Sequence, residues 1–291
     1  MARTLGIDTS HWDGHVDFTK AKAAGAFYAF LKASQWVQDP LFAEGWKNAK
    51  AAGLLRGAYH YLDWGWSEVS QAALFCKILK ADVGELPPVL DLEQDPAPFG
   101  LTPAQVYARV TKFLTIVQAT LGRVPMLYTG YYYWNYYGKN DPAMLKYPFW
   151  LPWYSPEWYI KLRTFGGTGA PKPWLRWKFW QYTDQGDGLK YGCQSKSVDL
   201  NWFDGSVEEL YAFASSTPVP PPPPSQSGSY KVNVGSLKVF AGPGDMYKQV
   251  ALPLTLGTIV TVLETVTSYG EQWSKIASPA GWVRAVYLIP A

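Results

Sequence analysis

The sequence predicts an α/β fold, an irregular TIM-like (β/α) barrel with eight strands and about five helices, followed by a small all-β barrel. Three observations support this prediction. Short apolar runs alternate with helical stretches over most of the chain. A proline-rich segment then interrupts the pattern, and short strand-like runs with Gly/Pro turns follow it. With 291 residues, 48% of them hydrophobic, the chain can build more than one core.

Eight apolar runs in the first part of the chain are typical of buried strands. They are Leu5–Asp8, Ala26–Leu31, Gly57–Leu62, Pro88–Leu92, Pro125–Tyr128, Phe149–Tyr154, Phe179–Tyr182 and Val198–Trp202. Helical stretches separate the early runs, at Phe18–Ala24, Leu41–Ala52, Ser67–Ala81 and Pro103–Leu121. The later strands are joined by loops rich in Gly, Pro and Trp. This pattern favours a closed, parallel-type barrel. The alternative, an open doubly wound sheet, lacks the support of a Gly-rich phosphate loop.

Residues 217–228 are expected to form a linker. They contain the run Pro220 to Pro224, which cannot enter a helix or a sheet interior, and a Ser/Gly-rich end. The prolines favour an extended polyproline II spacer. Two domains are therefore expected, at residues 1–216 and 229–291.

Composition excludes several classes of function. The net charge of +3 is small and no dense Lys/Arg run is present, so nucleic acid is not an expected partner. No stretch approaches the ~18 apolar residues of a membrane span, and the N-terminus passes into a strand without the apolar region of a signal peptide. The two cysteines, Cys76 and Cys193, are too few for a disulfide framework, and two separate thiols are expected.

The run Pro88–Glu93 ends with two carboxylates, Asp91 and Glu93, two positions apart. In a strand these side chains point to the same face, about 6.6 Å apart along the axis. Acids at the end of a buried strand lose part of their hydration, which costs free energy. A functional role would explain why they are placed there. Glycoside hydrolysis requires such a pair, with one carboxyl protonated and one charged. The alternative is a strand that runs out into an acidic loop.

Two further strands add acids at the same end of the predicted barrel. The first strand ends in Asp8 and the last carries Asp199. Active groups of (β/α) barrels lie at the C-terminal ends of the strands. Four acids from three strands are therefore expected at one mouth, which favours cleavage of a carbohydrate.

Ordered sequence motifs resemble glycoside hydrolase family 25, the Chalaropsis-type lysozymes or N-acetylmuramidases. These motifs are Gly6–Trp12, Phe30–Ser34, Gly53–Tyr61, Pro88–Glu93, Leu127–Thr129, Phe149–Leu151, Trp180–Tyr182 and Val198–Asn201. The resemblance covers residues 4–213. One departure is visible, because Gln35-Trp36 stands where the family usually has Glu-Gly, and contacts at the rim of the cleft are expected to differ.

The resemblance implies hydrolysis of the β-1,4 bond from N-acetylmuramic acid to N-acetylglucosamine in bacterial peptidoglycan, without a cofactor. Glu93 is the expected general acid, with a pKa raised by neighbouring acids. Asp91 is expected to hold the 2-acetamido group of the substrate, whose oxygen attacks the anomeric carbon with net retention. Asp8 and Asp199 would orient the substrate and this pair. Inversion, with one aspartate activating a water, stays open because the carboxylate spacing decides it.

Aromatic side chains on the same strand faces are candidates for sugar contact, although each could equally fill the barrel. They are Tyr59, Tyr61, Tyr128, Trp150 and Tyr154. His60 alternates with Tyr59 and Tyr61, so a structural role is expected for it. No metal site is expected, because the three histidines show no His-Glu-x-x-His pattern. All three precede Cys76, which excludes a cysteine peptidase with its histidine downstream.

Residues 229–291 contain five strand-like runs, at Lys231–Val234, Leu237–Phe240, Thr258–Val266, Trp273–Ile276 and Gly281–Val286. The segments Leu237–Val239, Gly242–Gly244 and Gly281–Val283 resemble a bacterial SH3-like domain. The resemblance implies binding to peptidoglycan, through a wall peptide or the glycan. Candidate ligand-facing aromatics are Tyr247, Tyr269, Trp273, Trp282 and Tyr287.

Two other classes of function are open at this stage, a non-catalytic peptidoglycan-binding protein and a hydrolase of chitin-like N-acetylglucosamine oligomers. A muramidase without a signal peptide and with a wall-targeting module resembles a phage-type endolysin. Such a protein is made in the host cytoplasm and acts at the cell wall after release. We expect it to act as a monomer.

Overall fold

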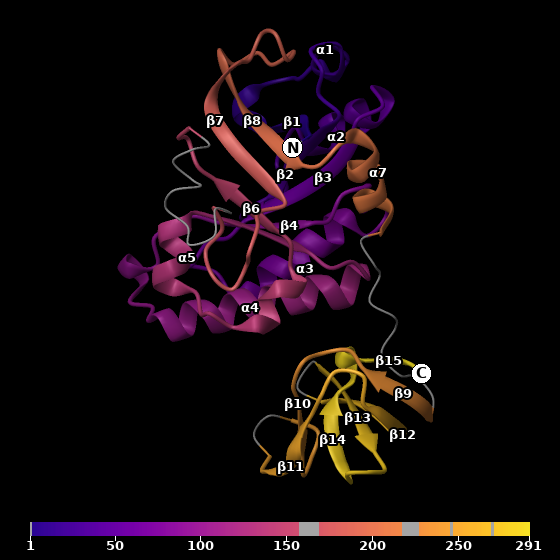
Figure 1. Ribbon diagram of the computed structural model, residues 1–291. Coiled ribbons are helices and arrows are strands. Elements are labelled where there is room, and N and C mark those ends of the chain that lie inside the picture. The colour runs from indigo at the N-terminus through magenta and orange to yellow at the C-terminus, as the bar shows by residue number, and fades with distance from the viewer. Residues whose placement is uncertain (1, 157–168, 217–226, 245–246, 269–270) are drawn as a thin grey trace. The chain divides into compact units, whose positions relative to one another are not determined.

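The computed structural model describes residues 2–156, 169–216, 227–244, 247–268 and 271–291. The chain divides into two compact units, Met1–Thr217 and Pro218–Ala291, each with its own hydrophobic core (Figure 1). Most of the expected linker, residues 217–226, lies outside the described residues. None of the helices in the described part of the chain is long and apolar enough to cross a membrane.

Eight strands close into a barrel in the N-terminal unit, in chain order. They are β1 (Arg3–Thr9), β2 (Tyr28–Ser34), β3 (Leu55–Tyr61), β4 (Val89–Leu92), β5 (Met126–Thr129), β6 (Phe149–Pro152), β7 (Phe179–Asp187) and β8 (Ser197–Asp204). Each overlaps one of the eight predicted apolar runs. The closed eight-stranded barrel is thereby confirmed.

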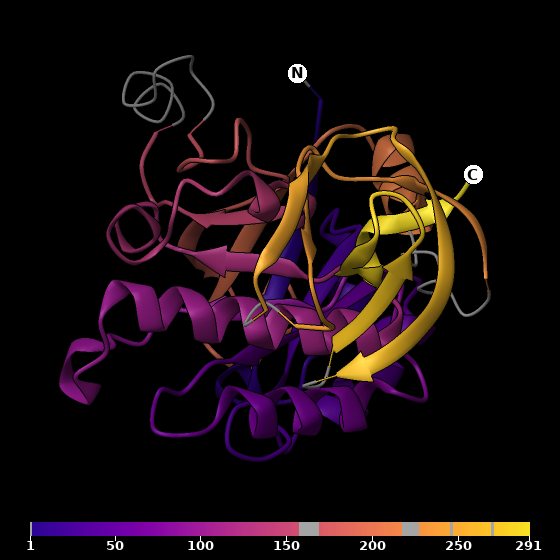
Figure 2. The same cartoon turned by 90° about the horizontal axis from the view of Figure 1, so that it is seen from below.

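Six α-helices are present in the described part of this unit, against about five expected. They are α1 (Phe18–Ala23), α2 (Phe42–Ala51), α3 (Glu68–Leu79), α4 (Pro103–Leu121), α5 (Tyr131–Tyr137) and α7 (Val207–Ser216). The first four match the predicted stretches, and α3 and α4 lie side by side outside the barrel (Figure 2). The patterns did not single out α5, because its tyrosines are poor helix formers, and burial of Trp134 anchors it instead.

In the described residues of the N-terminal unit, three short 3₁₀ helices lie in loops, η1 (His11–Asp13), η2 (Ala97–Phe99) and η3 (Pro142–Lys146). The first follows β1, where the backbone N–H of Trp12 donates to the Ser10 hydroxyl at 3.2 Å and the backbone N–H of Ser10 donates to Asp13 at 2.8 Å. These contacts fix the loop that follows the strand bearing Asp8.

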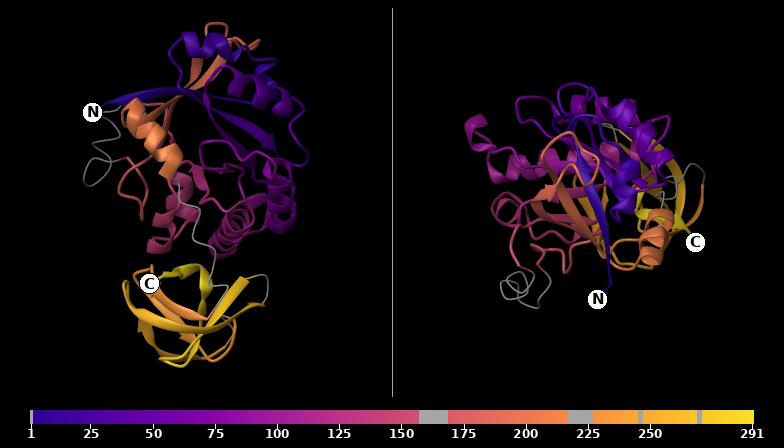
Figure 3. Two further views of the ribbon diagram at one scale, coloured as in Figure 1. Left: turned by 90° about the vertical axis from the view of Figure 1, so that its right-hand side faces the viewer. Right: turned by 90° about the horizontal axis from the view of Figure 1, so that it is seen from above.

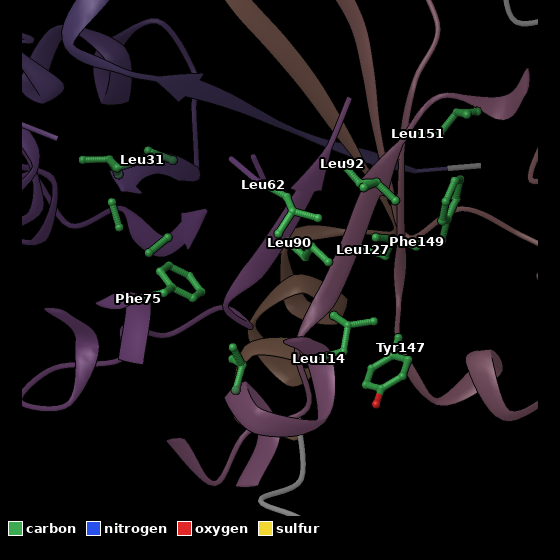
Figure 4. Packing of buried hydrophobic residues seen from close by; sticks show 14 of the residues in the cluster. Leu31, Leu62, Phe75, Leu90, Leu92, Leu114, Leu127, Tyr147, Phe149 and Leu151 are labelled. Atoms are coloured by element: carbon green, nitrogen blue, oxygen red, sulfur yellow. The ribbon is translucent and has the colours of Figure 1, made fainter. Parts of the chain in front are cut away.

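Side chains of the barrel strands alternate between two layers. Outward residues pack under the helices, among them Leu31, Leu90, Leu92, Leu127, Phe149 and Leu151 (Figure 4). Inward residues form a second cluster of rings and aliphatic chains, including Tyr28, Phe30, Trp150, Phe179 and Phe203. Gly57 is required beside these rings, because a Cβ there would lie 2.2 Å from Phe30. The aromatic filling closes the barrel below its mouth.

Strand β8 corrects one expectation, because it runs antiparallel to both neighbours, β7 and β1. A parallel-type barrel, irregular in its second half, was expected. The connection between β7 and β8, residues 188–196, contains no helix, and a parallel crossover needs a dozen or more residues. A hairpin is therefore the connection that this loop allows. The N-terminal end of β8 lies, as a result, at the C-terminal ends of the other strands.

The C-terminal unit is a seven-stranded antiparallel sheet whose strands curve around one another (Figure 3). Its elements are β9 (Gly228–Val232), β10 (Leu237–Phe240), β11 (Gln249–Leu254), β12 (Ile259–Ser268), β13 (Glu271–Ile276), β14 (Gly281–Arg284), the 3₁₀ helix η4 (Ala285–Tyr287) and β15 (Leu288–Pro290). The prediction missed β11 and β15. Both are edge strands and both contain a proline, which weakens the sequence pattern of a strand.

Candidate active site

The acids predicted on β4 lie at the mouth of the barrel. Val89 and Asp91 point inward while Leu90 and Leu92 join the outer core, so Glu93, directly after the strand, continues the inward face. Asp91 is buried and Glu93 reaches solvent. The strand thereby places one carboxyl in the floor and one in the opening of the same pocket.

Asp8 and Asp199 come from neighbouring strands and face each other in the register of β1 and β8. Asp199 was expected to reach the same mouth on the last strand, and the structure brings it there on a strand of opposite direction. Asp199 is the third residue of an antiparallel strand, and the reversal of β8 brings it to the mouth. Asp8 is buried, with 7% of its surface exposed, and Asp199 is half-buried.

All four acids line one pocket of about 70 Å³. Its wall is completed by Tyr59, Tyr128, Trp150 and Gln181. No group of three or more His, Cys, Asp or Glu side chains in the described ranges is arranged to hold a metal ion. The pocket therefore combines carboxyl groups with aromatic rings, the two elements that recognition and cleavage of a sugar require.

Asp8 and Asp199 differ in their proton affinity. Burial raises the pKa of Asp8 to about 6, against the lowering effect of hydrogen bonds from Asn201 and Gln181. Burial, together with the charges of Asp8 and Asp13, raises the pKa of Asp199 to about 9. Near neutral pH the two acids together hold one proton.

Asp91 and Glu93 also share a proton. Burial and the charge of Glu93 raise the pKa of Asp91 well above its ordinary value. Burial also raises the pKa of Glu93, whereas a hydrogen bond from Asp91 and the charge of Lys32 lower it. The expectation that neighbouring acids raise the pKa of Glu93 was therefore wrong in its cause, because desolvation is responsible.

The predicted aromatics occupy different positions around this pocket. Tyr59, Tyr128 and Trp150 line it. Trp150 is also part of the barrel filling, since its ring stacks on Phe30 with centroids 4.5 Å apart. Tyr61 lies under the Lys32 ammonium, 5.1 Å from the ring centroid. Tyr154 is half-exposed and is linked to the pocket by a hydrogen bond to Gln181.

Three polar residues around the acids were not predicted: Lys32, Gln181 and Asn201. Each lies inside a motif that marked the family resemblance, and each has the inward parity of its strand. The amide of Gln181 donates to Asp8 at 2.9 Å and to Asp199 at 3.0 Å, and Asn201 donates to Asp8 at 2.7 Å. These residues could have been found from the sequence, because each is a polar residue within an apolar strand run and lies on the inward face of its strand.

His60 has the structural role expected of it. It is fully buried, and burial lowers its pKa to about 4. Its Nε2 donates to the Gln71 oxygen at 3.0 Å, since that oxygen is an acceptor, and its Nδ1 accepts from Ser34 at 2.9 Å. Cys76 and Cys193 are buried free thiols, as predicted.

Gln35 and Trp36, which stand where the family usually has Glu-Gly, lie in a turn directly after β2. A bridge between Ser34 and Gln38 closes the turn, and Trp36 is 52% exposed. The Gln35 oxygen accepts a hydrogen bond from Lys32 at 3.1 Å. The residue that departs from the family pattern is thus in contact with the lysine whose charge acts on Asp91 and Glu93.

Comparison with known proteins identifies the family of this barrel. The profile of glycosyl hydrolases family 25 matches residues 7–189. The chain belongs to glycosyl hydrolases family 25. It is 32% identical to lysozyme M1 of Streptomyces globisporus over 222 residues, 73% of this chain and 71% of that protein. It is 28% identical to the N,O-diacetylmuramidase of Chalaropsis sp., over 72% of this chain and 98% of that protein.

The family 25 barrel also resembles solved structures. The bacterial lysozyme of Streptomyces coelicolor superimposes with a TM-score of 0.62 and 30% identity, over 75% of this chain and 99% of that structure. The protein is therefore a glycoside hydrolase, and the interpretation as a non-catalytic binding protein is set aside.

Proposed function

We propose that the barrel unit hydrolyses the β-1,4 bond between N-acetylmuramic acid and N-acetylglucosamine in bacterial peptidoglycan. One observation carries the proposal: Asp8, Asp91, Glu93 and Asp199 line a single pocket with aromatic walls in a family 25 chain. The similar proteins that bear the names lysozyme and muramidase support this choice of bond.

In this proposal Glu93 is the general acid and Asp91 binds the 2-acetamido group of the substrate. Asp91 Oδ1 is buried at the pocket and has no hydrogen-bond partner among the described residues. A buried acceptor without a partner costs free energy, which a donor on the substrate would recover. The acetamido N–H is such a donor.

Binding of the acetamido group also prepares the acid. As a carboxylate, Asp91 accepts the acetamido N–H, so the proton that it shares with Glu93 moves to Glu93. Glu93 lies in the opening of the pocket, where it donates this proton to the glycosidic oxygen. The bound substrate thereby moves the proton to the residue that uses it.

The reaction then has two steps. The acetamido carbonyl oxygen bonds to the anomeric carbon as the glycosidic C–O bond breaks, and Glu93 gives its proton to the leaving oxygen. Water next attacks the anomeric carbon, its proton returns to Glu93, and the bond to the acetamido oxygen breaks. Two displacements at one carbon give net retention. Inversion, with an aspartate activating water, is the competing mechanism.

We propose that the C-terminal unit is an SH3-like module that binds the cell wall. The unit has its own core and a net charge of +2, from five basic and three acidic residues, which suits an anionic wall. Tyr247 is 41% exposed and Trp282 is half-buried, so both are candidates for ligand contact. Trp273 is buried in contact with Phe240, which corrects its assignment to the ligand face. Tyr269 lies outside the described residues.

The combination of a muramidase barrel and a wall-binding module supports a role as a phage-type endolysin. In this role the protein is made in the host cytoplasm, acts at the cell wall after release and works as a monomer. These parts of the proposal rest on the sequence.

The test is digestion of purified peptidoglycan by the wild type and by Glu93→Gln, with mass spectrometry of the fragments. We expect reducing N-acetylmuramic acid ends from the wild type. We expect a loss of activity of at least ~10²-fold in the variant, because the amide has no acidic proton to transfer to the leaving oxygen.

Asp95→Asn is the matched control. Asp95 is an exposed acid in the same loop, and an asparagine retains its turn contact with the backbone N–H of Ala97. Its activity should stay within about twofold of wild type, as for most surface substitutions. Reducing N-acetylglucosamine ends, or preferential cleavage of chitin oligomers, would contradict the bond assignment. Full activity of Glu93→Gln would remove Glu93 from the reaction.

A further inference from the structure

The side-chain amide of Gln181 is held in one orientation. Gln181 lies on β7 and is 2% exposed. The hydroxyl groups of Tyr128 and Tyr154 donate to its oxygen, at 2.8 and 2.7 Å. An amide nitrogen only donates and an ionised carboxylate only accepts, so the nitrogen is the end of the amide that faces the acids, and the oxygen is left to accept from the two hydroxyls. The nitrogen therefore points to Asp8 and Asp199.

Both N–H groups of that nitrogen are used, one on each acid of the β1/β8 pair. The nitrogen lies 2.9 Å from Asp8 Oδ2 and 3.0 Å from Asp199 Oδ2. Asn201 adds a second amide donor to Asp8 Oδ2, at 2.7 Å, and its own oxygen is held by the indole N–H of Trp150 at 2.9 Å. Asp8 Oδ2 thus receives two fixed donors and Asp199 receives one.

This asymmetry distinguishes the two acids chemically. Donors aimed at a carboxylate oxygen favour its ionised form, and the acid with fewer donors keeps the proton more readily. The separation between the pKa of Asp8, about 6, and that of Asp199, about 9, agrees with the geometry.

We propose that Gln181 and Asn201 are positioning residues that keep Asp8 ionised and leave the proton on Asp199. The pocket then starts each turnover with one proton on each of two acid pairs, Asp8/Asp199 and Asp91/Glu93. Protonated Asp199 is a hydrogen-bond donor to the sugar, and ionised Asp8 is an acceptor. This inference extends the proposed function, although the placement of the proton can be measured without substrate.

Other groups around Asp8 also influence its charge. Those that face it from the surrounding elements are Asp13 after β1, Tyr28 on β2, Tyr59 on β3, Asp91 on β4, Tyr128 on β5, Tyr154 after β6 and Asp199 on β8. Every one of them is neutral or acidic. Asn201, Gln181 and Asp199 donate hydrogen bonds to Asp8, and the amides of Gln181 and Asn201 stabilise its anion whether or not Asp199 carries a proton.

The experiment is a pH titration of ¹³C-labelled aspartate carboxyl groups by NMR, on the full-length protein without substrate. Asp8→Asn and Asp199→Asn assign the two signals. In the wild type we expect Asp8 to titrate near pH 6 and Asp199 near pH 9. In Gln181→Met, which keeps the side-chain length but has no donor, the titration of Asp8 should move up by about 1–2 pH units.

Two controls separate positioning from general damage. Tyr154→Phe removes one of two contacts to the Gln181 oxygen and no donor to the acids, so the Asp8 titration should stay where it is. Gln118→Met removes a buried amide from α4, outside the pocket, and should move neither titration.

The pH profile of kcat/KM provides the second readout. In Gln181→Met its acidic limb should move up with the titration of Asp8, whereas in Gln118→Met it should match the wild type. An unchanged Asp8 titration in folded Gln181→Met, or a proton on Asp8 and not Asp199 in the wild type, would overturn the inference. Absence of muramidase activity with the expected titrations would overturn the proposed function alone.

Discussion

Lys32 places a positive charge beside the acid pair on β4. Its side chain has the inward parity of β2, its ammonium lies over Tyr61 and its donor contact goes to the neutral amide of Gln35. Among the described residues no carboxylate forms an ion pair with it. Its charge therefore acts on Asp91 and Glu93, whose pKa values it lowers.

Lys32→Met should move the basic limb of the pH–activity profile. The proposed mechanism needs a proton on the Asp91/Glu93 pair, so activity should be present below the pKa of this pair and lost above it. Removing the positive charge raises that pKa, and the limb should shift to higher pH by about 0.5–1 unit. The release of reducing ends from pH 4 to 10 measures the shift.

Gln35 provides the matched pair of variants for this prediction. Gln35→Met keeps the lysine and its charge, so the basic limb should not move. Gln35→Glu supplies an anion at the Lys32 ammonium and should shift the limb in the same direction as Lys32→Met. A shift to lower pH in Lys32→Met would contradict the assigned role of the charge.

At the scale of elements, helix α4 shows how local sequence fixes a boundary. The hydroxyl of Thr102 accepts from the backbone N–H of Gln105 at 3.3 Å, and the Gln105 side chain accepts from the backbone N–H of Thr102 at 2.8 Å. This capping box starts the helix, and Gly122, with φ of 66°, ends it. Between these signals Val106, Val110 and Phe113 pack into the outer core.

Thr102→Ala should destabilise the barrel unit by about 1 kcal/mol, because the first turn loses a partner for its backbone N–H. Denaturant unfolding of the barrel transition measures this change as a lower midpoint with an unaltered slope.

Thr111→Ala in the middle of the same helix is the control. The Thr111 hydroxyl donates back to the carbonyl of Tyr107 at 2.9 Å, and alanine is the better helix former at such a position. The control should match or slightly exceed wild-type stability. Equal losses in both variants would show that the cap has no special contribution.

At the scale of the whole molecule, our proposal gives catalysis and wall binding to separate units. Among the described residues, the inner and outer clusters of the barrel contain none beyond Ala214, and the cluster of the C-terminal unit begins at Tyr230. Each unit therefore buries its own apolar side chains, and this is the physical requirement for independent folding.

A chain that ends at residue 216 should keep kcat/KM on soluble glycan fragments within about twofold, because the four acids and their supports belong to the barrel. Its co-sedimentation with insoluble peptidoglycan should fall by at least ~10-fold, since the second binding site is lost. The isolated C-terminal unit should sediment with the wall. Equal sedimentation of the truncated and full-length proteins would contradict the wall-binding proposal.

The sequence by itself determined the strands, because each buried strand is a short apolar run whose pattern depends on neighbouring residues alone. It also identified Asp91 and Glu93 as a pair, because side chains two residues apart in a strand lie on the same face. Helices α5 and α7 and the edge strands β11 and β15 did not follow from local pattern, since contacts with distant residues stabilise them.

The tertiary structure alone decided how the acids are used. The reversal of β8 sets Asp199 opposite Asp8, and no property of Val198–Trp202 specifies its direction. Gln181 and Lys32 join the site because barrel closure brings β7 and β2 to the same mouth as β4. Proton affinities depend on burial and on donors from other strands, which exist only once the barrel has closed.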